Sequence, residues 1–397
     1  MTIKPFKAAR PAKENAAAVA AVPYDVVDTA EAKALAAGNP MSFLHVSRPE
    51  IDLPGNVSAS SPEAYAQARK ALDGMISGGV LVQDPERRFY AYRQTMGSHS
   101  QTGIVALFDT KEYVSGAIKK HEKTRKDKED DRTCHIRTLG AQTGPAFLTY
   151  RDDRAIDELV AEACALEPLC DFTAGDGIRH TVWEIAGENS CRADTLAELF
   201  ARIPAMYIAD GHHRSAAAAR FAEENGFEGE SRWFMAVAFP ASQLKILPYN
   251  RLLRDVCGMS KYEFMSALSE NFTIGAKGER NAKMYFDGDW TDISWSVPEG
   301  ADAVSSLDVS YLQDNLLGPV LGIKDVRTDP RISFMGGIRG DKALSAKVDS
   351  GEAALAFSMN PVTVEEMMAI ADAGGIMPPK STWFEPKLRS GLFVHLL

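Results

Sequence analysis

Residues 206–215 carry the pattern in this chain that is best suited to binding an anion. An apolar strand expected over 205–209 runs through Asp210 and Gly211 into an alanine-rich helix expected over 213–225. The first turn of a helix has backbone N–H groups without intrahelical partners, and the helix dipole makes that end positive. Glycine lets a ligand approach the backbone closely. The side-chain donors that follow are His212, His213 and Arg214. The layout predicts a phosphate site, although a turn before a basic, solvated helix start explains the same pattern equally well.

Asp210 stands directly before this loop, where a carboxylate would repel a phosphate unless a cation or a proton intervenes. Mg²⁺ would remove the repulsion, because it favours one or two carboxylates together with phosphate oxygens and water. We therefore expect Asp210 to hold Mg²⁺ or to activate a substrate hydroxyl; alternatively, it caps the following helix. Zinc is not expected, because the adjacent His212 and His213 diverge by about 100° on a helix and no third ligand is spaced to join them.

Four segments together carry a family resemblance. Residues 210–214 resemble the Gly-x-x-Arg phosphate loop of sulfiredoxin, of the nucleotide-binding domain of the partitioning protein ParB and of the ParB-like free serine kinases. The other three segments read Val-Pro-Tyr-Asp-Val-Val at 22–27, His-Glu-Lys-Thr at 121–124 and Lys-Ser-Thr-Trp-Phe-Glu-Pro-Lys at 380–387. In this order, and spread over nearly the whole chain, they resemble the domain-of-unknown-function 1015 family. The resemblance implies a mixed α/β (α+β) fold with a ParB/sulfiredoxin-like core that binds ATP or ADP.

The resemblance also implies roles for residues 121–124. His121 and Glu122 become candidate catalytic residues, with Glu122 as general base, while Lys123 and Thr124 become candidate nucleotide ligands together with Arg132. By charge pattern alone, residues 121–132 suit a solvated helix or a mobile loop. The outer half of this segment departs from the family pattern, which has a proline near position 126 and a lysine near 129.

The remaining two segments are candidates for contact with substrate and nucleotide. Tyr24 and Asp25 follow a proline that fixes the backbone, so they either line a substrate pocket or end a strand. Near the other end of the chain, four side chains offer phosphate donors, and we expect them to return to the phosphate loop: Lys380, Ser381, Thr382 and Lys387. Trp383 or Phe384 could stack on a base; an aromatic tail docked on a sheet edge is the alternative.

Composition limits the classes of function. With 397 residues and 45% hydrophobic content, we expect a region 1–245 with the phosphate-binding core and a C-terminal α/β region 246–397 whose end returns to the cleft. The net charge of −10 argues against nucleic-acid binding, which needs a basic face. Five cysteines without Cys-x-x-Cys spacing favour the reducing cytoplasm, and no apolar run approaches the ~20 residues of a membrane span. The expected partners are a nucleotide and a small-molecule substrate, with a homodimer possible.

Periodicity and turn residues predict the elements that would position these residues. Residues 19–27 are expected as a strand and turn, and Pro62 opens a helix over 62–76. The expected strands are 88–94, 103–108, 146–150, 180–185, 233–239 and 353–358, with a short β segment at 290–297. The expected helices are 30–37, 154–165, 194–201, 261–270 and 362–373.

These patterns favour a nucleotide- and Mg²⁺-dependent phosphotransferase that acts on a small hydroxylated metabolite such as serine. The alternative is a non-catalytic nucleotide switch of ParB type that controls dimerisation or partner docking. The absence of a Walker Gly-x-x-x-x-Gly-Lys-Ser/Thr motif argues against a P-loop enzyme. Sulfiredoxin-type redox chemistry is also excluded, because no cysteine stands next to Arg214 as nucleophile.

Overall fold

The computed structural model describes residues 1–397, and the chain forms two compact units. The first unit consists of Met1–Lys120, Thr124–Leu244 and Pro386–Leu397. The second consists of His121–Lys123 and Lys245–Glu385. Most of the second unit is therefore inserted into the chain of the first, which resumes at Pro386. We predicted separate domains at 1–245 and 246–397, and this division stays a prediction.

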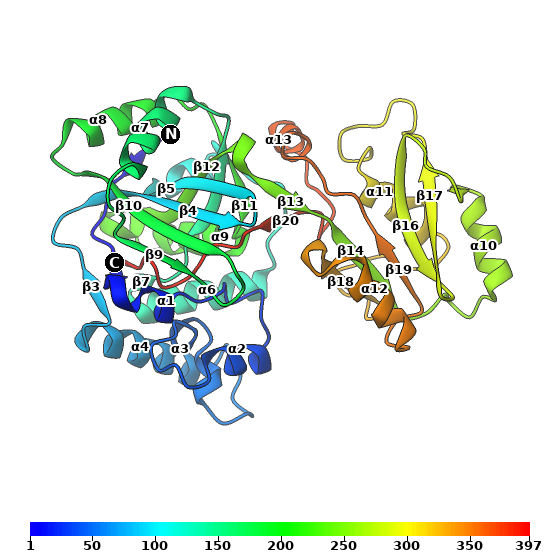
Figure 1. Cartoon of the computed structure of the whole chain (residues 1–397), viewed down its shortest axis with the longest axis horizontal. Helices are drawn as coiled ribbons and strands as arrows, with labels where there is room; N and C mark the ends of the chain where they lie inside the picture. Colours follow the sequence, from blue (N-terminus) through cyan, green and yellow to red (C-terminus); the bar gives the residue numbers. More distant parts are fainter. The chain divides into compact units, whose positions relative to one another are not determined.

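A nine-stranded mixed sheet forms the centre of the first unit (Figure 1). Its strands are β1 (Ile3–Lys4), β4 (Arg88–Met96), β5 (His99–Asp109), β6 (Ile118–Lys119), β8 (Ala146–Tyr150), β9 (Cys170–Thr173), β10 (Arg179–Gly187), β11 (Met206–Asp210) and β12 (Trp233–Pro240). The order is β6–β11–β8–β12–β5–β4–β10–β9, with β1 beside β5. β12 runs parallel to β8 and β11 parallel to β6, whereas the other pairs are antiparallel. The predicted mixed α/β fold class is confirmed.

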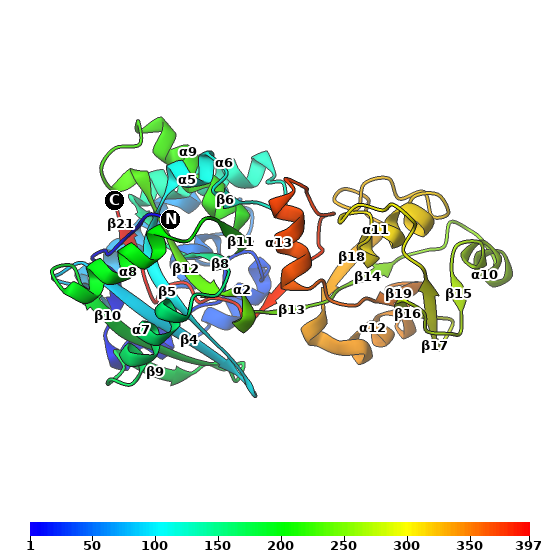
Figure 2. The same ribbon diagram turned by 90° about the horizontal axis from the view of Figure 1, so that it is seen from above.

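Three helices supply most of the helical residues in the apolar core on one face of this sheet. They are α7 (Arg154–Cys164), α8 (Cys191–Ala201) and α9 (His212–Glu224). In α7 the buried side chains recur at spacings of three and four residues, as an amphipathic helix requires: Ile156, Leu159, Val160 and Ala163. The Asp153 carboxylate caps α7 by accepting hydrogen bonds from two backbone N–H groups. α7 and α8 lie side by side, while α9 packs beside α5 (Thr110–Val114) and α6 (Lys126–Leu139) (Figure 2).

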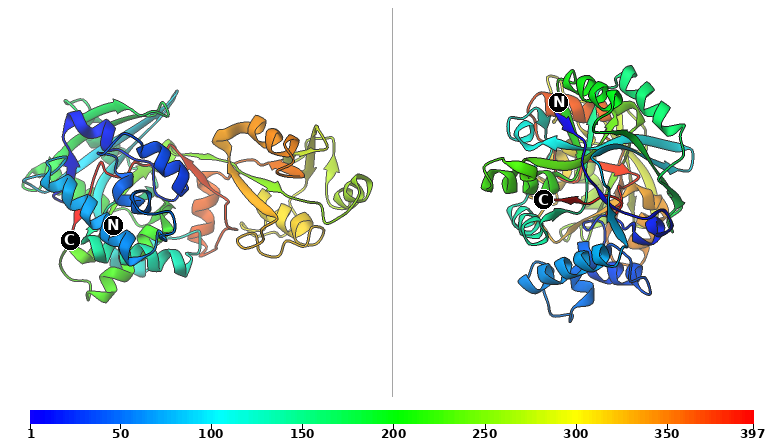
Figure 3. Two further views of the ribbon diagram at one scale, coloured as in Figure 1. Left: turned by 90° about the horizontal axis from the view of Figure 1, so that it is seen from below. Right: turned by 90° about the vertical axis from the view of Figure 1, so that its left-hand side faces the viewer.

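A second apolar cluster of the first unit includes Phe43, Leu72, Leu139 and Val394. It joins the N-terminal helices to the end of the chain (Figure 3). The helices are α1 (Ala16–Val19), α2 (Thr29–Ala36), α3 (Leu44–Ser47) and α4 (Pro62–Ser77). The short strands β2 (Ala9–Pro11) and β3 (Leu81–Gln83) pair, as do β7 (Ala141–Gln142) and β21 (His395–Leu396).

One predicted element of this unit is wrong. Residues 19–27 do not form a strand: α1 ends at Val19, and the only pairing that follows is a single bridge between Ala21 and Ser390. The alanine run before Val19 has high helix propensity, and Pro23 lacks the N–H that a strand ladder needs. By contrast, the helix predicted at 62–76 is confirmed as α4, with Pro62 in its first turn.

The second unit contains a six-stranded antiparallel sheet in the order β15–β17–β16–β19–β14–β18. Its strands are β14 (Tyr249–Leu253), β15 (Thr273–Ile274), β16 (Arg280–Phe286), β17 (Asp289–Trp295), β18 (Ile332–Gly336) and β19 (Leu355–Ser358), and β13 (Lys245–Leu247) pairs with β20 (Trp383–Glu385). Its helices are α10 (Lys261–Ser269), α11 (Asp308–Leu312), α12 (Gly340–Asp349) and α13 (Val364–Asp372). α10 and α13 each begin with a capping box. No helix of either unit is long and apolar enough to cross a lipid bilayer.

Candidate functional site

The predicted phosphate loop forms the junction between β11 and α9 in the first unit. Gly211 is the N-cap residue of α9, with φ of +87° and ψ of 31°, a left-handed conformation that glycine adopts without strain. The first helical hydrogen bond of α9 runs from the Ser215 N–H to the Gly211 carbonyl, at 2.9 Å. No side chain caps this end of the helix. The helix therefore presents an uncapped, positively polarised end, as the sequence predicted.

Arg214 folds back over this turn. A Cβ atom at position 211 would lie only 3.0 to 3.2 Å from the Arg214 guanidinium, so a larger residue there would make the guanidinium shift. Arg214 Nη2 donates to Asp210 Oδ2 at 2.8 Å, and Nη1 donates to the carbonyl of Pro145. Its Nε is buried and has no hydrogen-bond partner. A buried N–H without an acceptor is costly, so this group is suited to bind an anionic ligand.

Asp210 is neutralised by two cations of the chain itself. Lys387 Nζ lies 3.2 Å from Asp210 Oδ1, and Arg214 holds the other oxygen. Burial would raise the pKa of the Asp210 carboxyl, but Lys387 and Arg214 outweigh it and lower the pKa to about 2. A phosphate can therefore sit beside Asp210 without Mg²⁺ to screen it, and the role of Asp210 as a magnesium ligand stays a prediction. No group of three or more His, Cys, Asp or Glu side chains is arranged to hold a metal ion.

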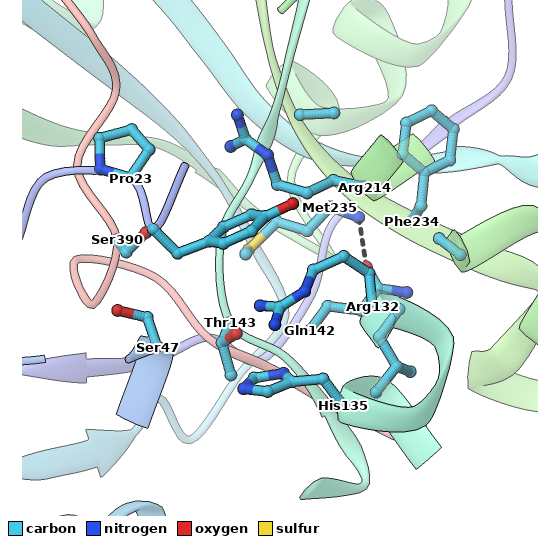
Figure 4. A pocket seen from close by; sticks show the side chains of 15 residues that line it. Pro23, Ser47, Arg132, His135, Gln142, Thr143, Arg214, Phe234, Met235 and Ser390 are labelled. Carbon is cyan, nitrogen blue, oxygen red and sulfur yellow. Dashed lines mark hydrogen bonds between the residues drawn. The ribbon is translucent and has the colours of Figure 1, made fainter. Parts of the chain in front are cut away.

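A pocket opens beside Arg214 in the first unit (Figure 4). Its empty volume is about 570 Å³, including space open to solvent. The polar lining residues are Tyr24, Ser47, Arg132, His135, Gln142, Thr143, Arg214 and Ser390. The only charged side chains among all lining residues are the two arginines, and no carboxylate lines the pocket. This lining favours an anionic ligand.

Arg132, on α6, is the second cation of the pocket. Its guanidinium carbon lies 4.0 Å from the centroid of the Tyr24 ring, in a cation–π contact. Burial raises the pKa of Tyr24, while the charges of Arg132 and Arg214 both oppose that rise. The phenol of Tyr24 is thus within electrostatic reach of both guanidinium groups, which come from different helices.

His135 lies one turn further along α6 and is buried. Its Nε2 is 3.2 Å from the carbonyl oxygen of Val46, an acceptor only, so Nε2 carries the proton. Burial, assisted by Arg132, lowers the pKa of His135 to about 3. His135 is therefore neutral at physiological pH, and its Nδ1 is a hydrogen-bond acceptor.

The structure places the other predicted residues of the first unit in different positions. Tyr24 lines the pocket, whereas Asp25 is exposed and acts on Arg214 through its charge, helping to raise the arginine pKa against burial. His213 Nε2 accepts a hydrogen bond from the Arg125 N–H at 3.0 Å. Burial lowers the pKa of His213. The buried His212 does not line the pocket, and the Thr124 hydroxyl donates to Glu129 at 3.3 Å.

Two of the family segments meet inside the second unit. His121 Nε2 lies 3.3 Å from the Thr382 hydroxyl, and the His121 carbonyl accepts a hydrogen bond from the N–H of Met377 at 2.8 Å. The Ser381 hydroxyl donates to the Pro378 carbonyl at 2.6 Å. Lys380 Nζ lies 5.3 Å from the Tyr249 ring centroid. Glu122 is half-buried and Lys123 is exposed. The predicted roles of these residues at the phosphate loop stay predictions.

Several residues of the pocket were not predicted from the sequence. Ser47, His135, Thr143 and Ser390 reach the pocket from segments far apart in the chain. Gln-Thr-Gly-Pro at 142–145, directly before a buried strand, is a polar turn that could have drawn attention. The sequence around Ser47, His135 and Ser390 has no comparable pattern that would indicate a pocket.

A second cavity lies in the second unit, with an empty volume of about 860 Å³. Arg254 and Arg339 line it, but both are exposed to solvent and need no ligand to satisfy them. The buried, unpartnered Nε of Arg214 makes the pocket of the first unit the better candidate site.

Comparison with known proteins identifies the family. Residues 3–310 match the family described as "Protein of unknown function (DUF1015)", so the chain belongs to that family. Among solved structures, it is similar to a free serine kinase in complex with AMP, at 12% identity and a TM-score of 0.37, covering 70% of this chain and 86% of that one. It is also similar to a C-terminally truncated SbnI from Staphylococcus aureus, at 12% identity and a TM-score of 0.41, covering 74% and 87%. A conserved hypothetical protein from Pyrococcus furiosus matches at 13% identity and a TM-score of 0.37, covering 74% and 95%. No curated protein sequence matches. Likenesses this weak carry no inference about function.

Proposed function

We propose that the protein is a cytoplasmic, ParB/sulfiredoxin-like phosphotransferase that uses ATP or ADP with Mg²⁺ and acts on a small hydroxylated metabolite such as serine. The observation that carries the proposal is the combination of an uncapped helix start at Gly211 with the buried, unpartnered Nε of Arg214 beside one pocket. Both features favour a phosphate group at residues 211–214. The sequence resemblance of this loop to that of the free serine kinases supports the same assignment.

Phosphoryl transfer needs little more from a protein than positioning and charge stabilisation. The acceptor hydroxyl oxygen would form a bond to the terminal phosphorus while the bond from that phosphorus to the leaving nucleotide oxygen breaks. The leaving oxygen keeps the electron pair, and the hydroxyl proton passes to a carboxylate. When bound, Mg²⁺ would supply charge neutralisation on the phosphate oxygens. Glu122 is our candidate base, because Asp210, with a pKa near 2, is a weak base and is better suited to orient Arg214 and Lys387.

The ion pairs of Asp210 favour a second candidate function, a non-catalytic nucleotide switch. Both of its carboxylate oxygens bind cationic side chains, so the carboxylate beside the phosphate loop is not poised to accept a proton. A site with this arrangement could hold a nucleotide without transferring a phosphoryl group, and the bound state could control dimerisation or partner docking.

Product analysis separates the two functions. Purified protein is incubated with ATP or ADP, Mg²⁺ and a panel of hydroxy amino acids and hydroxy acids, and masses are read for the gain of one phosphoryl group. A phosphotransferase gives product from at least one acceptor, and Glu122→Gln lowers kcat by at least ~100-fold if this residue is the base. Glu112→Gln is the matched control, because Glu112 is half-buried like Glu122 and its carboxylate binds Thr2 away from the pocket. Nucleotide binding without product from any acceptor would favour the switch.

A further inference from the structure

We propose that Arg132, Tyr24, His135, Thr143 and Ser47 form an acceptor subsite that selects a small hydroxy acid by its carboxylate. The inference rests on the proposed function, because it names the acceptor class of the same pocket. Uncharged alcohols and sugars should therefore be poor acceptors at this subsite. The starting observation is that both charged groups lining the pocket are arginines and that no carboxylate lines it.

Arg132 is held in place by Asp131 and Tyr24. Its Nε and Nη2 both contact Asp131 Oδ2, at 2.8 and 2.7 Å, and Tyr65 donates a hydrogen bond to the other oxygen of that carboxylate at 2.8 Å. The ring of Tyr24 packs against the guanidinium face. These contacts leave Nη1 for a ligand. A guanidinium held in place before binding loses little entropy when it donates to a carboxylate.

The two arginines can serve two different anions. Arg214 is in the first turn of α9, whereas Arg132 is on α6, and Figure 4 shows their side chains reaching the pocket from separate elements. Arg214 has its buried Nε beside the predicted phosphate loop. Asp131 cancels the net charge of Arg132, so this second site recognises its ligand by directed hydrogen bonds. Hydrogen bonds of this kind suit a singly charged carboxylate better than a nucleotide polyphosphate, which carries several negative charges.

The uncharged polar groups of the pocket fit the rest of such a ligand. His135 Nδ1 can accept a hydrogen bond from a hydroxyl or an ammonium group, since Nε2 donates to the Val46 carbonyl. Ser47 is 5% exposed, and its hydroxyl is buried without a hydrogen-bond partner. Serine or glycerate offers a hydroxyl or ammonium group to these polar side chains and a carboxylate to Arg132.

Paired ligands that differ only in the carboxylate test the inference. L-serine is compared with L-serinamide, and D-glycerate with glycerol, by calorimetric titration into protein saturated with ATP. We expect at least one acid to bind at least ~10-fold more tightly than its uncharged counterpart, the scale of one charge-assisted hydrogen bond. Arg132→Gln should abolish this preference while changing the affinity for ATP by less than about 3-fold, and Arg132→Lys should retain part of it. The control Arg137→Gln, on the exposed side of α6, should change neither.

Each other outcome overturns a defined claim. Equal binding of acids and their uncharged counterparts, or no binding of either, contradicts the subsite. So does an Arg132→Gln variant that loses ATP affinity as strongly as Arg214→Gln, because Arg132 would then serve the phosphate. Phosphorylation of glycerol but not of glycerate would overturn the subsite and leave the phosphotransferase intact. Arg132-dependent binding of an acid that is never phosphorylated would support the subsite and contradict the phosphotransferase. Thermal unfolding of each variant verifies that the fold is retained.

Discussion

Asp210 lies in the proposed phosphate site although its side chain carries a negative charge. Its carboxylate lies between Arg214 and Lys387, so the three side chains together carry one positive charge next to an uncapped helix start. The carboxylate also orients the Arg214 guanidinium over Gly211. The carboxylate therefore fixes the position of the guanidinium, while the three side chains keep the positive potential that a phosphate needs.

Replacing Asp210 with Asn tests this charge arrangement through its pH dependence. The pKa of Asp210 is lowered from 3.8 to about 2, so its ion pairs stabilise the folded state above about pH 4, and this stabilisation is lost as the pH falls toward 2. We expect Asp210→Asn to lower the free energy of unfolding at neutral pH, and the difference from the parent protein to shrink below about pH 4. Urea unfolding at several pH values measures this. A difference that does not change with pH would mean that Asp210 stabilises the fold by packing alone.

At the scale of elements, the junction of β11 with α9 holds the site together. The strand ends at Asp210, Gly211 turns the chain with a positive φ, and the helix begins one residue later. The tail after Pro386 brings Lys387 to this junction, while Ser390 pairs with Ala21 through two backbone hydrogen bonds of 2.8 and 3.0 Å. A helix start, a strand end and the last segment of the chain thus converge on one turn.

Gly211→Ala tests the turn, with Gly116→Ala as matched control. Both glycines have φ above +80°, so either substitution should cost about 1 to 2 kcal/mol of stability. Only the methyl group at position 211 would also meet the Arg214 guanidinium, since nothing lies within 4 Å of a Cβ at 116. We expect both variants to lose similar stability and only Gly211→Ala to lose affinity for ATP as well. Equal nucleotide affinity in the two variants would indicate that Arg214 is not part of the nucleotide-binding site.

Local signals predicted the elements better than they predicted the site. The strand 146–150 was predicted with its observed bounds, and β11 and α9 were each predicted to within one residue at both ends, because alternation of apolar residues and a glycine mark them. The strand at 19–27 was wrong, since alanine propensity and Pro23 decide that segment. Ser47 and Ser390 could not be predicted as pocket residues, because only tertiary packing brings them there.

At the scale of the whole molecule, most of the second unit is an insertion that begins and ends with two paired strands. Lys245 and Glu385, its first and last residues after the 121–123 segment, are direct partners in the β13–β20 pair. The chain therefore leaves the first unit and returns to it at neighbouring points, a few Å apart. The first unit meanwhile has its own sheet and its own apolar core.

Deleting the insertion tests whether the first unit folds by itself. A chain in which a short glycine-serine linker replaces Lys245–Glu385 should fold cooperatively, because its ends need only bridge a strand pair. Removing Pro386–Leu397 instead should abolish cooperative unfolding, because this segment buries Leu388, Leu392, Phe393 and Val394. Circular dichroism during thermal unfolding measures both. A linker-closed chain without a cooperative transition would show that the first unit depends on the second.

The central claim, a nucleotide phosphate held by residues 211–214, is tested most directly by calorimetric titration of ATP and ADP into the full-length protein. Arg214→Ala should lose about 1.5 to 3 kcal/mol of binding free energy, roughly 10- to 150-fold in Kd, because a charged hydrogen-bond donor is removed. Arg220→Ala, further along the same helix and outside the pocket, is the control and should bind like the parent protein. If the parent protein binds ATP or ADP and folded Arg214→Ala binds it equally well, or if the parent binds neither, the site assignment is wrong.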